Sequence, residues 1–188
     1  MFYKLDAHPI YQWDESRQAI NMQEMLANNQ PLGTYFEGEP DHYNTKPPLL
    51  IWLQVIFMLL TDNPEFAMRL PSALAAVCTI ITLVFFFNAT LKKPMWGIFA
   101  GLVLVSSFGY TELHSARTGD FDALVTLWIA LIACQYYLYL ETEKRKFLYQ
   151  AALFFGLAIA TKASVPFMLL PLLFIWTILV KKAEVSPL

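Results

Sequence analysis

Apolar residues in the second half of the chain gather in long runs that short polar turns separate. A transmembrane helix needs about 20 predominantly apolar residues, and several of these runs approach that length. They cover about residues 67–91, 95–111, 122–140, 147–162 and 164–180. The pattern predicts an all-α membrane protein, with a bundle of about five transmembrane helices over residues 67–182 and a cytoplasmic tail at 183–188.

Residues 1–66 are more polar, and we expect them to form the first external loop. Within residues 14–28 the apolar positions recur at helical spacing, which predicts a short amphipathic helix. Residues 47–60 form a shorter apolar run that begins directly after Lys46 with two prolines. Runs of about 10–14 residues lie at a membrane surface more often than they cross it, and prolines suit a first helical turn. We therefore expect an interfacial helix at 47–60.

Basic residues mark alternate turns of the chain. Lys92-Lys93, Lys144–Lys146 and Lys181-Lys182 alternate with poorly basic turns such as "TELHSARTGDFD". Cytoplasmic turns are enriched in Lys and Arg, so we place the basic clusters in the cytoplasm and everything before residue 67 outside. The alternative is that 47–60 crosses as a hairpin with 67–91, which would put the N-terminal segment in the cytoplasm. The prediction is a multi-pass protein of the cytoplasmic (inner) membrane with periplasmic loops.

Composition agrees with a membrane protein. Hydrophobic residues make up 57% of the chain, charged residues 15%, and the mean hydropathy is +0.45, whereas soluble domains average about a quarter charged residues. A net charge of −2 argues against a nucleic-acid partner. Cys78 and Cys134 lie within apolar runs, where we expect small buried side chains and no disulfide framework.

Charged residues that face the predicted external side are the candidates for chemistry. Asp14 and Glu15 begin the amphipathic helix, where carboxylates also serve as caps or favour the helix dipole. Arg17 is either a surface charge or a ligand contact, and Lys46 either snorkels at the membrane surface or contacts a phosphate. On spacing alone, capping is the better explanation for the two carboxylates.

A second group lies at the outer mouth of the third predicted span. Arg117, Asp120 and Asp122 gather at the rim of an apolar bundle, where charges are costly. Carboxylates there either cap the helix, act as a general base or hold a cation. Glu39, Asp41 and His42 form a polar group with side chains that can ligate a divalent metal, but their spacing matches no strict metal-ligand template, so the sequence does not support a metal site there.

Five motifs, in order, resemble a known family. They are "WDESRQAINMQEML", "YFEGEPDHYNTKPPLLIWL", "RLPSAL", "SARTGDFDALVTLW" and "GLAIATKASVPFMLLP". Together they resemble the N-terminal part of polytopic glycosyltransferases of the C superfold, in the family 39, protein-mannosyltransferase-like group that includes the bacterial aminoarabinose transferases that modify lipid A. The resemblance implies transfer of a sugar from a polyprenyl-phosphate donor to a lipid or protein acceptor at the outer membrane face.

The resemblance also implies roles for residues. Asp14 matches the family's candidate catalytic base, with Glu15 beside it, and Lys46 matches a lysine that approaches the donor phosphate. Asp122 matches an aspartate of the second external loop, with Asp120 as a neighbour. Arg117 matches a basic position of the same loop and is expected to contribute to substrate binding. Apart from the resemblance, Arg17 is also a candidate for substrate binding. The implied reaction is a single displacement with inversion, for which a metal is not obligatory.

The chain departs from the family in two respects. Some members have a glutamate before the lysine that is linked to a metal site, and this position is Thr45 here, so a metal is not carried over. Full members are far longer and have a span before the first loop, so we expect this chain to be an N-terminal fragment. The rival hypotheses are a piece of a transporter or channel, in which ionisable groups would lie near mid-membrane, and a catalytically inactive remnant.

Overall fold

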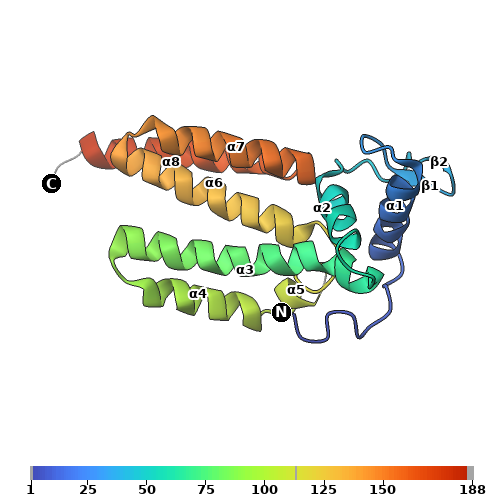
Figure 1. Ribbon diagram of the computed structural model, residues 1–188. Coiled ribbons are helices and arrows are strands. Elements are labelled where there is room, and N and C mark those ends of the chain that lie inside the picture. The colour runs from blue at the N-terminus through green and yellow to red at the C-terminus, as the bar shows by residue number, and fades with distance from the viewer. Residues whose placement is uncertain (1, 113, 186–188) are drawn as a thin grey trace.

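The computed structural model describes residues 2–112 and 114–185 and is almost entirely helical (Figure 1). Two elements precede the long helices: α1 (Asp14–Asn28) and α2 (Leu49–Met58), with a small hairpin of β1 (Tyr35–Phe36) and β2 (Glu39–Pro40) between them. The remaining elements are α3 (Pro64–Leu91), α4 (Pro94–Ser106), α5 (Phe108–Thr111), α6 (Asp122–Thr142), α7 (Arg145–Thr161), a 3-10 turn at Pro166–Met168 and α8 (Leu169–Val185).

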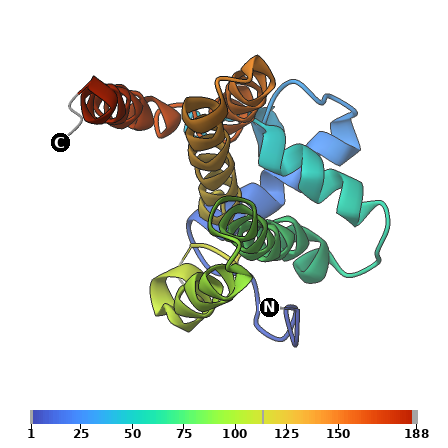
Figure 2. The same cartoon turned by 90° about the vertical axis from the view of Figure 1, so that its left-hand side faces the viewer.

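The long helices α3, α4, α6, α7 and α8 run side by side along one direction, and α1, α2 and the hairpin gather at one end of them (Figure 1). Figure 2 looks along this bundle, with α3 and α6 near the centre and α4 and α8 at the outside. Helix α3 packs against α4 and α6, and α6 packs against α7. The all-α membrane fold expected from the hydrophobic pattern is confirmed.

Helices α3 and α6 are the two described helices that are long and apolar enough to cross a membrane. Three other apolar helical stretches are shorter, at Leu49–Met58, Pro94–Ser106 and Pro166–Val180. The turns after α3 and after α6, and the C-terminal end of α8, lie at the end of the bundle away from α1 and α2 (Figure 1). The three basic clusters therefore share one end, as the charge pattern predicts, and which side of a membrane that end faces stays a prediction.

Local sequence explains where several elements begin and end. Asn63 caps α3, because its side-chain oxygen accepts a hydrogen bond from the N–H of Phe66, and Pro64 follows at the first helical position. The hairpin turns through Glu37 and Gly38, which both have positive φ (55° and 82°), the backbone that two-residue hairpin turns require. The predicted amphipathic helix at 14–28 coincides with α1.

Two expected helices differ from the structure. The run at 95–111 does not form one helix: α4 ends at Ser106, and α5 is a separate turn. Ser107 has extended backbone dihedrals (φ −78°, ψ 116°), which ends the helical hydrogen bonding there. The run at 164–180 begins with the 3-10 turn and continues as α8 to Val185.

Two apolar clusters fix the short helices to the bundle. Leu50 of α2 packs with Phe121 and with residues of α3 and α6, while Ile51 packs against Met22 and Met25 of α1. Both α2 residues are fully buried. Consecutive residues of α2 thus bind to opposite partners, so α2 connects α1 with the ends of α3 and α6.

Candidate active site

Asp14 and Lys46 meet at the end of the bundle. Asp14 is the first residue of α1, and Lys46 lies just before α2; their Oδ2 and Nζ atoms are 3.7 Å apart. Both side chains are partly exposed. The helix cap is Trp13, with a positive φ of 77°, so Asp14 is not the capping residue. Its carboxylate lies in the first turn, where the helix dipole favours a negative charge.

Glu15 does not share the setting of its neighbour. Its carboxylate is buried and accepts hydrogen bonds from Arg69 Nε (2.8 Å) and Nη2 (3.0 Å) and from the N–H groups of Tyr11 (2.7 Å) and Gly119 (2.8 Å). Burial alone would raise the pKa of the Glu15 carboxyl, but these four donors lower it below its ordinary value. The expectation that Glu15 joins Asp14 as a second catalytic carboxylate does not fit this geometry, because its acceptor positions are filled.

Arg69, near the start of α3, was not among the residues singled out from the sequence. Besides Glu15, its guanidinium donates to the carbonyl groups of Leu5, His8 and Pro9 at 2.8–3.0 Å. Arg69 is 1% exposed. A charged residue inside an apolar run is expensive unless it is paired, and that signal, in the motif "RLPSAL", could have found it.

Asp120 lies in the loop before α6, and several elements hold it. Its carboxylate accepts from Gln18 Nε2 (3.0 Å) at one oxygen and contacts His114 Nδ1 (2.7 Å) at the other. Its carbonyl accepts from Ser72 Oγ (2.8 Å). The hydrogen bond to Asp120 raises the pKa of the His114 imidazole, although its partial burial opposes this. Asp120 is 5% exposed, so it is a rigidly placed carboxylate.

The two second-loop aspartates have different surroundings. Asp122 begins α6 and forms an ion pair with Lys162, with Oδ1 and Nζ 2.6 Å apart. A carboxylate oxygen of Asp120, instead, lies within 4.8 Å of a carboxylate oxygen of Asp14 and of a ring nitrogen of His114. The motif resemblance favoured Asp122, whereas in the structure Asp120 is the aspartate that lies beside Asp14 and His114.

Arg17 and Arg117 serve as connections within the loops. Arg17 donates to both carboxylate oxygens of Asp41 (2.6 and 2.8 Å) and stacks on the rings of Phe36 and Tyr43. This pairing holds the pKa of the Asp41 carboxyl well below its usual range. Arg117 forms an ion pair with Glu112 (3.3 Å). Both arginines were expected to bind substrate, and the structure gives each a protein partner.

The Asp41 carboxylate therefore stabilises the segment that follows the hairpin, and its oxygens are occupied by protein donors. Asn21 Nδ2 and the N–H groups of Tyr43 and Asn44 also donate to it. Among the described residues, the group that could hold a metal ion is Asp14, His114 and Asp120. A carboxylate–imidazole set of this kind suits several divalent cations, although both Asp120 oxygens already have protein partners.

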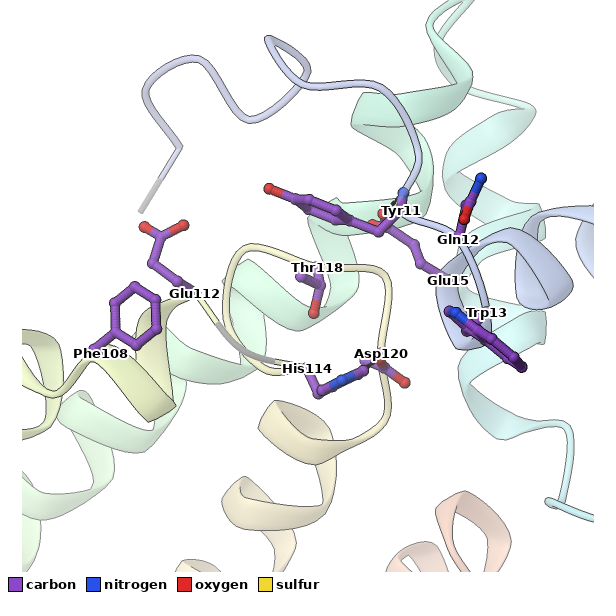
Figure 3. A pocket seen from close by; sticks show the side chains of 9 residues that line it. All are labelled: Tyr11, Gln12, Trp13, Glu15, Phe108, Glu112, His114, Thr118 and Asp120. Atoms are coloured by element: carbon purple, nitrogen blue, oxygen red, sulfur yellow. Dashed lines mark hydrogen bonds and ion pairs between the residues drawn. The ribbon is translucent and has the colours of Figure 1, made fainter.

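Two hollows flank these residues. The larger, about 540 Å³, lies between the segment before α1 and the α5–α6 loop. Tyr11, Trp13, His114 and Asp120 line it, and Phe108 lines it next to Glu112 (Figure 3). The smaller, about 220 Å³, is more polar and is lined by Asp14, Arg17, Gln18 and Lys46, among others. Asp120 borders the larger hollow and Asp14 the smaller, although a carboxylate oxygen of each lies within 4.8 Å of the other.

Several named proteins are similar to this chain in amino-acid sequence. The chain is 28% identical over 160 residues to an undecaprenyl phosphate-alpha-4-amino-4-deoxy-L-arabinose arabinosyl transferase of Aeromonas salmonicida (strain A449), covering 84% of this chain and 28% of the relative. It is 25% identical over 173 residues to the putative mannosyltransferase YycA of Bacillus subtilis (strain 168), covering 89% of this chain and 24% of that protein. The chain spans about a quarter of the length of these relatives.

A solved crystal structure also has a similar fold. The crystal structure of ArnT from Cupriavidus metallidurans bound to undecaprenyl phosphate superimposes with a TM-score of 0.83 over 95% of this chain and 33% of that one, at 22% identity. Its apo form gives the same values. This likeness confirms the fold class expected from the motifs.

The family model described as dolichyl-phosphate-mannose-protein mannosyltransferase matches residues 45–186, which is most of the chain. The match covers α2, the long helices and the loop that carries Asp120. The resemblance seen in the motifs is therefore confirmed, and the chain belongs to the dolichyl-phosphate-mannose-protein mannosyltransferase family.

Proposed function

We propose that the protein transfers a sugar from a polyprenyl-phosphate donor to a hydroxyl of a membrane lipid or protein acceptor, with inversion at the anomeric carbon. The observation that carries this proposal is the pair of Asp14 and Lys46, 3.7 Å apart at one end of an apolar helix bundle. A carboxylate and a cation at the membrane boundary are the two groups that the displacement needs. The aminoarabinose transferases to which the chain is similar use undecaprenyl-phosphate donors by name.

The step is a direct displacement. Asp14 takes the proton of the acceptor hydroxyl as its oxygen forms a bond to the anomeric carbon. The bond from that carbon to the phosphate oxygen breaks, and the electron pair leaves with the polyprenyl phosphate. Lys46 stabilises the charge on the departing phosphate. Because Lys46 rests against Asp14 in the free protein, a donor phosphate that attracts the ammonium also frees the carboxylate for the acceptor.

Other site residues hold this pair in place. Glu15 follows Asp14 directly, and its bonds to Arg69 and Gly119 fix the first turn of α1 against α3 and the loop before α6. We assign Glu15 and Arg69 positioning roles and Asp120 a supporting carboxylate role. Asp122 retains an ion pair with Lys162 and is assigned to the helix end.

We place the site at the outer face of the cytoplasmic membrane. The basic turns lie at one end of the bundle and the site at the other (Figure 1), and basic turns are characteristic of the cytoplasmic side. A water-excluding membrane boundary also strengthens the contacts of Lys46 with a phosphate.

Substitution of the proposed base tests this function. The full-length protein in membranes is incubated with undecaprenyl-phosphate mannose or undecaprenyl-phosphate aminoarabinose and membrane acceptors. We expect Asp14→Asn to lower kcat by about 10²–10⁴, the range that general-base catalysis contributes. The matched control is Asp62→Asn, an exposed aspartate in the turn after α2, which should transfer at the wild-type rate. Equal turnover by Asp14→Asn and the wild type would remove the base assignment.

A further inference from the structure

The smaller hollow contains a buried acceptor that the proposed displacement does not use. Gln18 lies one turn after Asp14 on the same face of α1 and is 1% exposed. Its amide nitrogen donates to Asp120 Oδ1 at 3.0 Å. Its amide oxygen has no hydrogen-bond partner within residues 2–112 and 114–185, and the residue lines the polar hollow beside Asp14 and Lys46.

The orientation of this amide follows from chemistry. A carboxylate oxygen accepts hydrogen bonds, so the group facing Asp120 must be the amide NH₂. The amide oxygen is then the atom without a partner within the described residues. Rotating the amide by half a turn would place this oxygen against the carboxylate oxygen of Asp120, and both atoms are acceptors. A buried acceptor without a donor is destabilising relative to one that is paired, so the position favours a ligand that brings a hydrogen.

The hollow specifies what kind of ligand that is. Lys46 contributes a positive charge to its wall beside the Asp14 carboxylate, whereas the charge of Arg17 is paired with Asp41. A phosphate that draws Lys46 away from Asp14 finds an ammonium that suits its oxygens. A phosphate diester, however, has no hydrogen to donate to Gln18. A hydroxyl or amino group does, so the wall matches a ligand that carries hydrogen-bond donors directly beside a phosphate, as a glycosyl phosphate does.

We infer that Gln18 is a specificity residue that accepts a hydrogen bond from a hydroxyl or amino group of the donor's sugar while its phosphate contacts Lys46. This inference rests on the proposed function, because it takes the donor to be a polyprenyl-phosphate sugar. In this proposal the two ends of the amide have separate tasks: the nitrogen supports Asp120, and the oxygen accepts from the sugar.

Binding measurements distinguish recognition of the sugar from recognition of the phosphate. Dissociation constants of the full-length protein in nanodiscs are measured for undecaprenyl phosphate, undecaprenyl-phosphate mannose and undecaprenyl-phosphate aminoarabinose. We expect wild type to bind a sugar-bearing donor more tightly than the sugar-free lipid. Gln18→Met, which keeps the length of the side chain, should lose about tenfold in affinity for that donor and keep its affinity for undecaprenyl phosphate. Lys46→Met should weaken all three.

A control variant tests the other contact of Gln18, its hydrogen bond to Asp120. His114→Ala deletes the second side-chain partner of the Asp120 carboxylate without touching the polar hollow. It should slow transfer and leave the preference for the sugar-bearing donor unchanged. If Gln18→Met behaves like His114→Ala, Gln18 acts only by holding Asp120, and the inference is overturned.

The remaining outcomes are also decisive. If wild type binds undecaprenyl phosphate but no sugar-bearing donor more tightly, the hollow does not read the sugar and the inference fails while the proposed function stands. If it binds none of the three lipids, the proposed function itself fails. Should Gln18→Met not fold, wild type is tested with donors that lack one sugar hydroxyl at a time. One such deletion must weaken binding about tenfold; equal binding of all of them overturns the inference.

Discussion

Arg69 shows how a single buried residue organises the site. Its five N–H donors go to Glu15 and to three carbonyl groups of the N-terminal segment. Because the guanidinium is planar and presents its donors in a fixed fork, these groups hold a defined position relative to α3. The residue after the proposed base is therefore anchored to a long helix.

We expect Arg69→Leu to destabilise the fold by about 3–5 kcal/mol, because it leaves the Glu15 carboxylate buried without its charge partner. The double substitution Arg69→Leu with Glu15→Gln should recover part of this loss, because it removes the unpaired charge. Thermal unfolding of the detergent-purified variants measures both effects.

Arg145→Leu is the control for that comparison, since Arg145 is exposed at the other end of the bundle. It should unfold close to the wild-type temperature. Equal stability of Arg69→Leu and Arg145→Leu would show that the buried ion pair does not hold the site together.

Sequence reasoning found some residues of the site and missed others, for a physical reason. It selected Asp14, Lys46 and Asp120, which the structure brings to one end of the bundle. It could not separate Glu15 from Asp14, because only the fold shows that Arg69, 54 residues away, neutralises one of two adjacent carboxylates. Gln18 carried no signal in the sequence, since an uncharged polar residue on an amphipathic helix is ordinary.

At the scale of elements, the loop before α6 is shaped by close packing against α3. A Cβ on Gly119 would lie 2.6 Å from Cγ of Met68. The same residue donates its N–H to Glu15 and accepts at its carbonyl from Gln54 Nε2 (3.1 Å). The loop thus approaches α1, α2 and α3 at a position where a side chain does not fit, and this places Asp120 next in the chain.

Gly119→Ala should therefore destabilise the fold by about 1–3 kcal/mol, as overpacking of a core does, and should lower transfer activity by displacing Asp120. Gly156→Ala is the matched control, because a Cβ there meets no atom within 4 Å and alanine favours a helix. Unfolding temperature and transfer rate are measured for both. An alanine at 119 that unfolds and turns over like the one at 156 contradicts this packing.

Hydrophobic periodicity located the helices better than it located their breaks. It gave the bounds of α1 and the core of α2, because an apolar stripe directly reflects which face is buried. The interruption between α4 and α5 went unseen, because Ser106 and Ser107 do not interrupt an apolar run enough to mark a change of backbone direction.

For the whole molecule, the separation of charges along the bundle predicts its orientation. In a variant without the native cysteines, Asp14→Cys should react with a membrane-impermeant maleimide added outside intact spheroplasts, since that position is partly exposed. Arg145→Cys should react only after the membrane is opened, because it lies in a basic turn that we place in the cytoplasm. Labelling is followed by a mass shift on a gel. External labelling of position 145 but not 14 would invert the orientation and remove the proposed site from the outer face.

The orientation could be argued from sequence because it depends on the count of basic residues in each turn, which needs no contacts. The meeting of α1 with the loop before α6 could not, since their hydrogen bonds join residues 102 and 104 positions apart. Apolar patterns show that two segments are buried, but they do not show against which partner.

Those long sequence separations imply an order of assembly. The residues around Asp14 are synthesised early; Arg69, at the start of α3, follows 54 residues after Glu15, and the 119–120 loop follows only after α3 and α4. Until that loop has been made, the Glu15 carboxylate lacks the N–H donor of Gly119. The proposed reaction centre is therefore completed late although Asp14 is translated early, and a chain that stops before residue 119 has the proposed base without the loop that positions it.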